Sequence, residues 1–165
     1  MMSILKDLKL LLIKVAAIAF VFFLLFTFLF GLARYQEPAM DPAIKDGDLV
    51  VFYRFTASGY YPGDPVVLNR DGKTEIRRVV AMPGDTVDIT QDGLVINGSL
   101  QYEFGIYERT ERYVEGVDFP YYVPENSVFV LGDCRTAAVD SRIYGAVGLK
   151  EIKGKVITVI RRRGI

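Results

Sequence analysis

Histidine is absent from the 165-residue sequence, and cysteine occurs once, as Cys134. Without histidine, the chain cannot form a Ser-His-Asp or Cys-His catalytic site or a histidine-ligated metal site. A single cysteine also excludes an intramolecular disulfide and a cysteine-cluster metal site. Because a thiolate would have no obvious base, we predict a small buried Cys134 rather than a nucleophile, and we expect no metal and no cofactor. Ser–Lys chemistry is the one common hydrolase mechanism that stays open.

An excess of charge of either sign is also missing. Lys and Arg together number 20, the same as Asp and Glu. Residues 1–33 contain three Lys and one Asp, so the remainder has 17 basic and 19 acidic residues and a net charge of −2. A domain with this balance lacks the basic surface of nucleic-acid-binding proteins, and we expect no nucleic-acid partner. The length suits one domain and an anchor.

A long hydrophobic run occurs once, from Val15 to Ala33. Such a run would form a helix of roughly 28 Å, about the thickness of the hydrocarbon core of a membrane. Three lysines precede it and Arg34 follows, so the positive-inside rule places residues 1–14 in the cytoplasm and residues 34–165 outside it. A cleavable signal peptide is the alternative, with small residues at 31–33, but the run is longer than the usual apolar core of a signal peptide. We predict an uncleaved, single-pass anchor in the cell membrane, in contact with lipid.

Beyond residue 34, the sequence is typical of short β-strands. Short runs rich in Val, Ile and aromatic residues alternate with turns that contain glycine. No ten-residue stretch there has helical periodicity. We predict a mainly β fold, an antiparallel β-sheet domain that follows one N-terminal transmembrane helix. The predicted strands are 49–53, 65–68, 74–82, 86–89, 94–96, 127–131 and 156–160.

Three segments of the predicted domain combine glycine, proline and charged residues. The first, Glu37–Asp48, reads EPAMDPAIKDGD; the second, Ile76–Asp85, reads IRRVVAMPGD; the third, Gly132–Gly145, reads GDCRTAAVDSRIYG. In this order they resemble the three sequence boxes of the type I signal peptidases (leader peptidases), a family of membrane serine endopeptidases. With the anchor, the resemblance covers nearly the whole chain. It implies the signal-peptidase-like β fold and a link to signal peptide processing in protein secretion.

The boxes depart from the family's pattern at the positions that carry catalysis. The resemblance puts the nucleophilic Ser at Ala39 and the Lys base at Arg77, so both positions are degenerate. A methyl group cannot attack a carbonyl, and an arginine that stays protonated cannot accept a proton. Glu37 stands where some relatives place an oxyanion-hole hydroxyl, and its negative charge would oppose an oxyanion. Ala138 replaces the Ser that supports the Lys in relatives. We therefore predict no catalytic residue.

Other residues of the boxes are kept, which suggests a binding role. The resemblance implies a peptide-binding groove formed by Glu37, Ala39, Met40, Pro42, Arg77 and Ala138. It also implies a structural ion-pair loop beneath the groove, formed by Asp133, Arg135, Asp140, Ser141 and Arg142. We expect a polypeptide to add as a strand near Glu37–Ala39 and the strand 74–82. Arg77 would then be a static cation that pairs with Glu37 or another carboxylate.

The segment at about 99–125 lies where the family carries a variable β insertion between its second and third boxes, and here the insert is short. It is rich in Tyr, Phe and acidic residues and has no clear period. Its rings either line a peptide groove or pack on the core, and we favour packing on the core.

A relocated Ser–Lys dyad is the remaining route to catalysis. Lys45 follows Ala39 by six residues, and Lys73 lies at a predicted hairpin. Ser58 and Ser99 stand beside glycines, as turn residues do. Nothing in the spacing of these residues indicates a dyad.

Two function classes remain. The first is a catalytically inactive pseudoprotease that binds secreted polypeptides as a chaperone or assembly factor. Family members without the dyad resemble assembly helpers of sortase-built surface pili, so the expected partner is a pilin-like polypeptide in a sortase-linked pilus system. The alternative is an active type I signal peptidase with an altered dyad. An engineered, inactivated mutant is a third interpretation, which the number of departures disfavours.

Overall fold

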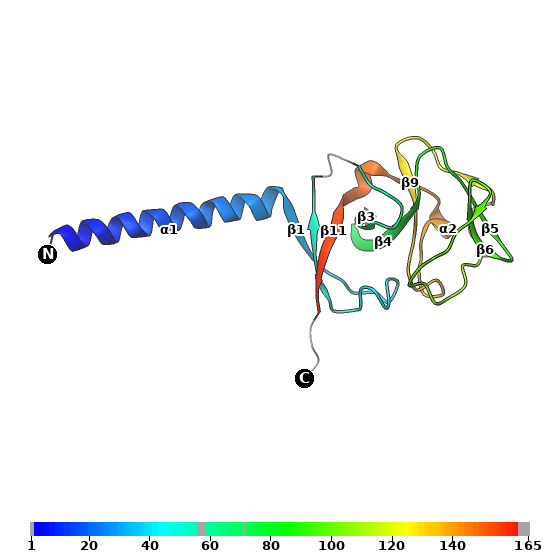
Figure 1. The fold of residues 1–165 in the computed structure, drawn as a ribbon, viewed down its shortest axis with the longest axis horizontal. Coiled ribbons are helices and arrows are strands. Elements are labelled where there is room, and N and C mark those ends of the chain that lie inside the picture. The colour runs from blue at the N-terminus through cyan, green and yellow to red at the C-terminus, as the bar shows by residue number, and fades with distance from the viewer. Residues whose placement is uncertain (1, 56–58, 71, 162–165) are drawn as a thin grey trace.

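The computed structural model describes residues 2–55, 59–70 and 72–161, with side chains from Lys6 onward. Ser58, one of the possible alternative nucleophiles, lies outside the described residues. A long N-terminal helix projects from a domain built of two β-sheets (Figure 1).

Helix α1 (Met2–Phe28) contains most of the predicted anchor but ends earlier than expected. Its segment Lys6–Phe28 is long and apolar enough to cross a membrane, with a mean hydropathy of 2.7, and none of it is buried. The predicted end of the anchor helix at Ala33 is wrong, because strand β1 (Phe30–Arg34) occupies these residues and pairs with β2 (Leu49–Tyr53). A continuous apolar run does not by itself distinguish the end of a helix from a strand.

The larger sheet has seven antiparallel strands in the order β1-β2-β11-β3-β4-β9-β10. Strand β11 comes last in the chain but lies between β2 and β3. The C-terminal strand of the domain therefore pairs with two strands from its N-terminal half. Strand β4 carries the start of the second box and lies inside the sheet, between β3 and β9. The remaining strands of this sheet are β3 (Pro65–Arg70), β4 (Lys73–Ala81), β9 (Ser127–Leu131), β10 (Val147–Gly148) and β11 (Ile152–Ile160).

A smaller sheet of four antiparallel strands, in the order β7-β6-β5-β8, forms the end of the domain that lies away from α1 (Figure 1). Outside α1, the described helices are α2 (Ser141–Tyr144) and the short 3-10 helix η1 (Leu149–Glu151). The predicted mainly β, antiparallel fold is confirmed, and each predicted strand overlaps an observed one. The strands of the smaller sheet are β5 (Thr86–Thr90), β6 (Gly93–Ile96), β7 (Ser99–Leu100) and β8 (Tyr121–Tyr122).

The first box is part of the hydrophobic core. Met40 and Ile44 are buried, and they pack in one cluster with Tyr35 and Phe52. Burial of a side chain of this size stabilises the folded state by about 1.5–3 kcal/mol. The loop that carries Ala39 is therefore held against the domain by its own apolar residues.

The aromatic residues of the insert divide between the core and the surface. Phe119 and Tyr121 pack against Phe129 of β9, as predicted. Tyr102 and Phe104 are 92% and 91% exposed, so the prediction is wrong for the first part of the insert. The described segment between β7 and β8 contains no strand, so its side chains have no alternating face directed at the core.

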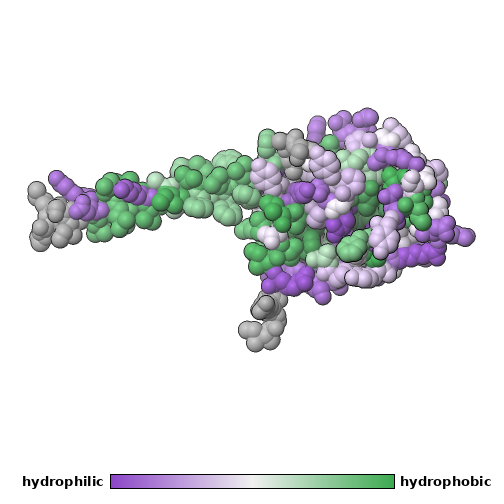
Figure 2. Space-filling view, in the orientation of Figure 1, coloured by the Kyte–Doolittle hydropathy of each residue, from purple (hydrophilic) through white to green (hydrophobic). Residues whose placement is uncertain are grey.

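Apolar surface continues from α1 onto the adjoining part of the domain (Figure 2). Leu32 of β1 and two residues of β11, Ile157 and Ile160, are each more than half exposed. The strands nearest the membrane helix therefore present apolar side chains on their outer face.

Candidate functional site

The first box forms the loop between β1 and β2, and backbone hydrogen bonds close this loop at its base. The Tyr35 N–H donates to the Asp48 carbonyl at 2.9 Å, and the Gly47 N–H donates to the Tyr35 carbonyl at 2.9 Å. Gly47 has a φ of +87°, a left-handed conformation that glycine adopts without strain. The Asp48 carboxylate accepts from the Lys45 N–H at 2.9 Å. The Gly-Asp pair thus turns the chain back into β2.

Ala39 lies inside the domain, where the first box meets the third. Its exposed fraction is 0%, and its carbonyl accepts a 3.0 Å hydrogen bond from the Cys134 N–H. Gly132 fits here because it has no side chain: a Cβ would lie 2.6 Å from the Ala39 oxygen and would overlap the methyl group of Ala138. The degenerate nucleophile position is therefore a close contact of small residues.

Arg77 of β4 is buried, with 2% of its side chain exposed. Its Nε and Nη2 donate to the Val139 carbonyl at 3.0 and 2.9 Å, and its Nη1 donates to the Ile76 carbonyl at 2.7 Å. Nη2 also donates to the Glu37 carboxylate at 3.0 Å, so the expected pairing with Glu37 is present. Burial acts to lower the pKa of Arg77, but Glu37 and the other contacts outweigh it and raise that pKa. Arg77 is a fixed cation that cannot serve as a base.

Three more ionisable groups surround Arg77. Glu75 lies two residues away on β4, with its Oε2 3.4 Å from Nη2 of Arg77, and burial raises the pKa of the Glu75 carboxyl. The hydroxyls of Tyr35 and Tyr144 are buried without a hydrogen-bond partner among the described residues, and burial raises the pKa of both. Glu37 is the nearer carboxylate partner of Arg77, at 3.0 Å against 3.4 Å for Glu75, and it alone accepts a described hydrogen bond from Arg77.

The third box is an ion-pair loop whose partners come from several parts of the chain. Arg142 contacts the Asp140 carboxylate twice at 2.9 Å, and Asp140 also accepts from the Gly132 N–H at 3.0 Å. Asp133 pairs with Arg78 of β4 through two guanidinium nitrogens. The loop is therefore joined to the second box by an ion pair. Arg78 follows Arg77 directly, but the sequence alone did not indicate its partner.

Two further residues of the loop bind outside it. Ser141 accepts a hydrogen bond from the Val130 N–H at 3.0 Å, which ties the loop to β9. Arg135 pairs with Glu103 of the insert. Both side chains are buried, and neither has a described hydrogen bond to Arg77 or Ala39.

An open pocket of about 630 Å³, which we call the Arg77 pocket, lies beside the degenerate base position. Of the predicted groove residues, Glu37 and Arg77 line it. Ala39, Met40 and Ala138 do not, because they are 0%, 0% and 1% exposed and belong to the packed interior. The other residues that line the Arg77 pocket are Arg34, Gln36, Lys73, Thr74, Glu75 and Val139.

Pro42, the last predicted groove residue, lies in a different pocket. This pocket has a volume of about 350 Å³ and is lined by Pro42 together with Asp41, Cys134 and residues of the insert. The prediction of one groove formed by all six residues is therefore wrong. A one-dimensional motif shows which residues are near the site but not which of them fill the core.

The alternation of side chains between the two faces of β4 could have identified further residues of the Arg77 pocket. Lys73, Glu75 and Arg77 are two residues apart, and such residues share one face of a strand. Arg34 and Val139 come from segments far away in sequence, and nothing in the sequence connected them to β4.

The open edge of β4 is shorter than predicted. Strand β3 pairs with β4 along Lys73–Arg78, whereas β9 pairs with its other side along Arg78–Ala81. On the side of β4 that faces β9, residues 73–77 therefore have no strand partner. The expected peptide-binding edge over 74–82 is wrong in its second half, because β9 occupies that side.

Comparison with known proteins gives the family. The chain matches the family described as "Signal peptidase, peptidase S26" over residues 8–160. The chain belongs to this family. It is 35% identical over 154 residues to Signal peptidase I of Bacillus licheniformis, covering 86% of this chain and 83% of that protein. It is 29% identical over 168 residues to Signal peptidase IB of Staphylococcus aureus, covering 92% and 88% respectively.

A solved structure agrees with this membership. The crystal structure of a signal peptidase I from Enterococcus faecalis V583 matches with a TM-score of 0.51 and 28% identity, covering 62% of this chain and 100% of that chain. The resemblance to the signal peptidases and the predicted fold are both confirmed. Membership of the signal peptidase family and the apolar helix α1 together indicate a single-pass membrane protein.

The signal peptidase fold does not bring the alternative dyad residues together in the described part of the chain. Lys45 is half exposed, and its amine lies 3.9 Å from the Asp41 carboxylate. Lys73 and Ser99 are both exposed, and no described hydrogen bond joins a serine hydroxyl to a lysine amine. Cys134 is partly exposed rather than buried as predicted, because it lies in the wall of a pocket, with its Sγ 3.8 Å from a Glu108 carboxylate oxygen.

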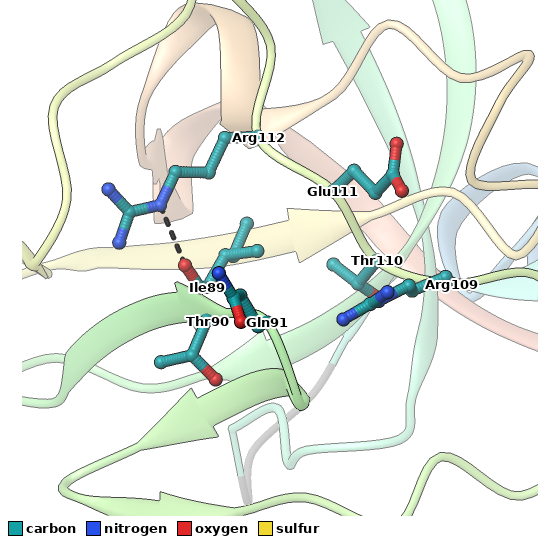
Figure 3. Close-up of a pocket in the computed structure, with 7 residues that line it drawn as sticks. All are labelled: Ile89, Thr90, Gln91, Arg109, Thr110, Glu111 and Arg112. Carbon is teal, nitrogen blue, oxygen red and sulfur yellow. Dashed lines mark hydrogen bonds between the residues drawn. The ribbon is translucent and has the colours of Figure 1, made fainter.

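A separate hollow of about 530 Å³ lies on the smaller sheet (Figure 3). Ile89–Gln91 form one wall and Arg109–Arg112 of the insert form the other. Nε of Arg112 donates to the Ile89 carbonyl at 2.7 Å, which joins the two walls. No residue of the three boxes lines this hollow, so it is distinct from the site that the signal peptidase family indicates.

Proposed function

We propose that this protein is a non-proteolytic member of the signal peptidase family that binds secreted polypeptides. The observation that carries the proposal is the pair of residues at the two positions that catalysis would need. Ala39 offers a buried methyl group where the resemblance places the nucleophile, and Arg77 offers a guanidinium bound to Glu37 and two carbonyls where it places the base. Neither side chain can attack a carbonyl or accept a proton.

Binding a polypeptide is a smaller demand than cleaving one. Catalysis needs an interaction that is stronger in the transition state than in the ground state, whereas a chaperone needs only to hold the chain. The uncovered side of residues 73–77 in β4 offers backbone groups to which an extended chain can add as a strand. The Ile76 carbonyl already accepts from Arg77, and the other backbone groups of this segment do not need a Ser at residue 39 or a Lys at residue 77. The Arg77 pocket beside them has room for side chains of the bound segment.

The partner that we propose is a secreted, pilin-like polypeptide, held during assembly of a sortase-built surface pilus. This part of the proposal is supported by the resemblance to family members without the Ser–Lys dyad. It places the β domain outside the cytoplasm, beside the membrane in which α1 is anchored.

An active signal peptidase is the second candidate, and the similarity to named signal peptidases favours it. The chain is 35% identical to Signal peptidase I of Bacillus licheniformis over most of both proteins. Activity would then require a nucleophile and a base other than residues 39 and 77, such as Ser99 with Lys45 or Lys73.

A reporter assay separates the two candidates. The full-length protein in detergent is incubated with a precursor that carries a cleavable signal peptide, and Signal peptidase I of Bacillus licheniformis is the positive control. We expect no cleavage above the detergent blank, because the two side chains needed for it are absent. Turnover that Lys45→Ala, Lys73→Ala or Ser99→Ala removes would overturn the proposal and support the active enzyme.

A further inference from the structure

A pocket of about 290 Å³, which we call the insert pocket, lies between β4, β6 and the first part of the insert. Its walls are mostly apolar, and they include Val79, Val80, Leu94, Phe104 and Ile106. None of the predicted groove residues lines it. The insert pocket is therefore separate from the Arg77 pocket.

Arg135 forms a polar part of the wall of the insert pocket. Its side chain is 1% exposed, and its Nη2 donates to Glu103. Its Nε and Nη1 are buried and have no hydrogen-bond partner among the described residues. A buried donor left unpaired costs about 1–3 kcal/mol, and native structures leave few such groups. Two donors of this guanidinium thus lack acceptors within the described chain.

The charges around Arg135 decide what kind of acceptor fits. Three arginines meet in this region, and each already pairs with one carboxylate: Arg78 with Asp133, Arg135 with Glu103, and Arg142 with Asp140. The cluster therefore has no net charge, and the repulsion of an incoming carboxylate by Glu103 offsets its attraction to Arg135. A backbone carbonyl supplies lone pairs without this repulsion.

Aromatic residues at the edge of the insert pocket indicate a macromolecular ligand. Tyr102 and Phe104 both line the pocket, yet they are 92% and 91% exposed. Tyr, Phe and Arg are enriched at protein–protein interfaces. There, the side chains that contribute most to binding lie at pockets from which the partner excludes water. A volume of about 290 Å³ accommodates one residue of a bound chain rather than a cofactor-sized molecule.

We propose that the insert pocket is a second polypeptide-binding site, which takes one apolar side chain while the backbone carbonyl beside it accepts hydrogen bonds from Arg135. Tyr102 and Phe104 cover the flanking residues of the bound chain. The proposal rests on the proposed function for its ligand class, a polypeptide. It adds a second point of contact on the insert, away from the open edge of β4.

The probe is the neutral tripeptide acetyl-Ala-Leu-Ala-amide, titrated into full-length protein in nanodiscs. The readout is the NMR signal of the Arg135 Nε–H, assigned by its loss in Arg135→Lys. We expect a saturable shift of this signal. Val80→Phe fills the insert pocket from the bulge between Val79 and Ala81 and should weaken binding by about ten-fold or more. Val114→Phe, the same change at an exposed position of the insert, is the matched control and should leave binding unchanged.

Additional variants and ligands separate binding at the insert pocket from a folding defect and from binding elsewhere. If Val80→Phe lowers the melting temperature strongly, the double variant Tyr102→Ala/Phe104→Ala replaces it, because both positions are exposed. This double variant should weaken binding by at least about three-fold. Absence of any shift would mean that water satisfies Arg135 and would overturn the inference. Tighter binding of acetyl-leucine than of acetyl-leucine amide would overturn the choice of a neutral acceptor. If Val139→Trp, at the Arg77 pocket, abolishes binding and Val80→Phe does not, this inference fails while the proposed function stands.

Discussion

At the scale of single residues, Arg77 is the structural centre of the degenerate site. Its guanidinium joins Glu37, Ile76 and Val139, which come from three separate segments. We expect Arg77→Met to destabilise the folded domain by about 3–5 kcal/mol, because it leaves a partly buried carboxylate and two carbonyls without their donor. Guanidinium chloride unfolding in detergent, followed by tyrosine fluorescence, measures the free energy of unfolding.

A surface pair provides the control for this measurement. Lys45 lies 3.9 Å from Asp41, and both side chains are about half exposed. Lys45→Met should cost less than about 1 kcal/mol, because solvent screens such pairs. Equal losses for Arg77→Met and Lys45→Met would show that the contacts of Arg77 do not stabilise the domain.

Glu75 makes the stability of the domain depend on pH. Burial raises the pKa of its carboxyl in the folded state above the ordinary value of 4.5, so the folded state binds this proton more tightly than the unfolded state does. The stability that this contributes is present below about pH 4.5 and is lost as the pH rises through the folded-state pKa. Glu75→Gln, which stays neutral, should therefore be more stable than the unmodified protein at about pH 8 and similar to it at about pH 4. The same change at the exposed Glu115 should give no such difference between the two pH values.

The pairing of Arg77 with Glu37 could be predicted from the box pattern, but the burial of the predicted groove residues could not. The box pattern placed Ala39 and Arg77 at the centre of the site, and the carboxylate at Glu37 suggested the partner of Arg77. Burial was not encoded in the pattern: Ala39 and Ala138 were expected to line a groove and instead fill the interior. Ala39 and Ala138 are buried because the first and third boxes pack against each other. This contact is a feature of the tertiary structure, and the sequence pattern does not contain it.

At the scale of elements, short apolar runs bounded by turns predicted the strands of the domain, whereas a strand that continues the apolar helix and the shortest strands were missed. Strands 49–53 and 127–131 were predicted with the observed bounds. β1 was missed because its residues continue the apolar run of α1, and only pairing with β2 distinguishes them from the helix. The two-residue strands β7, β8 and β10 are too short to have a period of their own.

The uncovered part of β4 gives a prediction about the partner. A tryptophan at Ala39 does not test the groove, because residue 39 is buried and its replacement would disrupt packing. Val139 is 54% exposed and lines the Arg77 pocket, so Val139→Trp can fill the pocket without entering the core. We expect Val139→Trp to reduce photo-crosslinking of a secreted partner to residues 73–77 by about ten-fold or more while the melting temperature is kept.

A matched substitution outside the site controls for the added ring. Ile157→Trp places a tryptophan at a position of similar exposure on β11. Unchanged crosslinking with Val139→Trp would mean that the Arg77 pocket no longer takes part in binding and that the partner docks elsewhere.

At the scale of the whole molecule, the order of the strands explains how a short chain forms both a membrane-proximal surface and a distal one. β11 returns to lie between β2 and β3, so β1, β2 and β11 form the part of the domain nearest α1 (Figure 1). The smaller sheet and the insert lie at the other end. The sequence could predict an antiparallel sheet from turns and short strands, but not this crossover, because strand order depends on contacts between segments about 100 residues apart.

The apolar outer face of the strands nearest α1 fits a domain that rests against the membrane surface. The charge asymmetry of the sequence further predicts that this surface is the extracytoplasmic one, with Lys6, Lys9 and Lys14 on the cytoplasmic side. Cys134 makes this testable, because it is the single thiol and is partly exposed in the β domain. A membrane-impermeant maleimide should label Cys134 in intact spheroplasts of a strain that produces the protein, and Cys134→Ser should remove the signal. If labelling, or digestion of the domain by added protease, occurs only after the spheroplasts are lysed, the domain lies in the cytoplasm and cannot meet secreted polypeptides after their export.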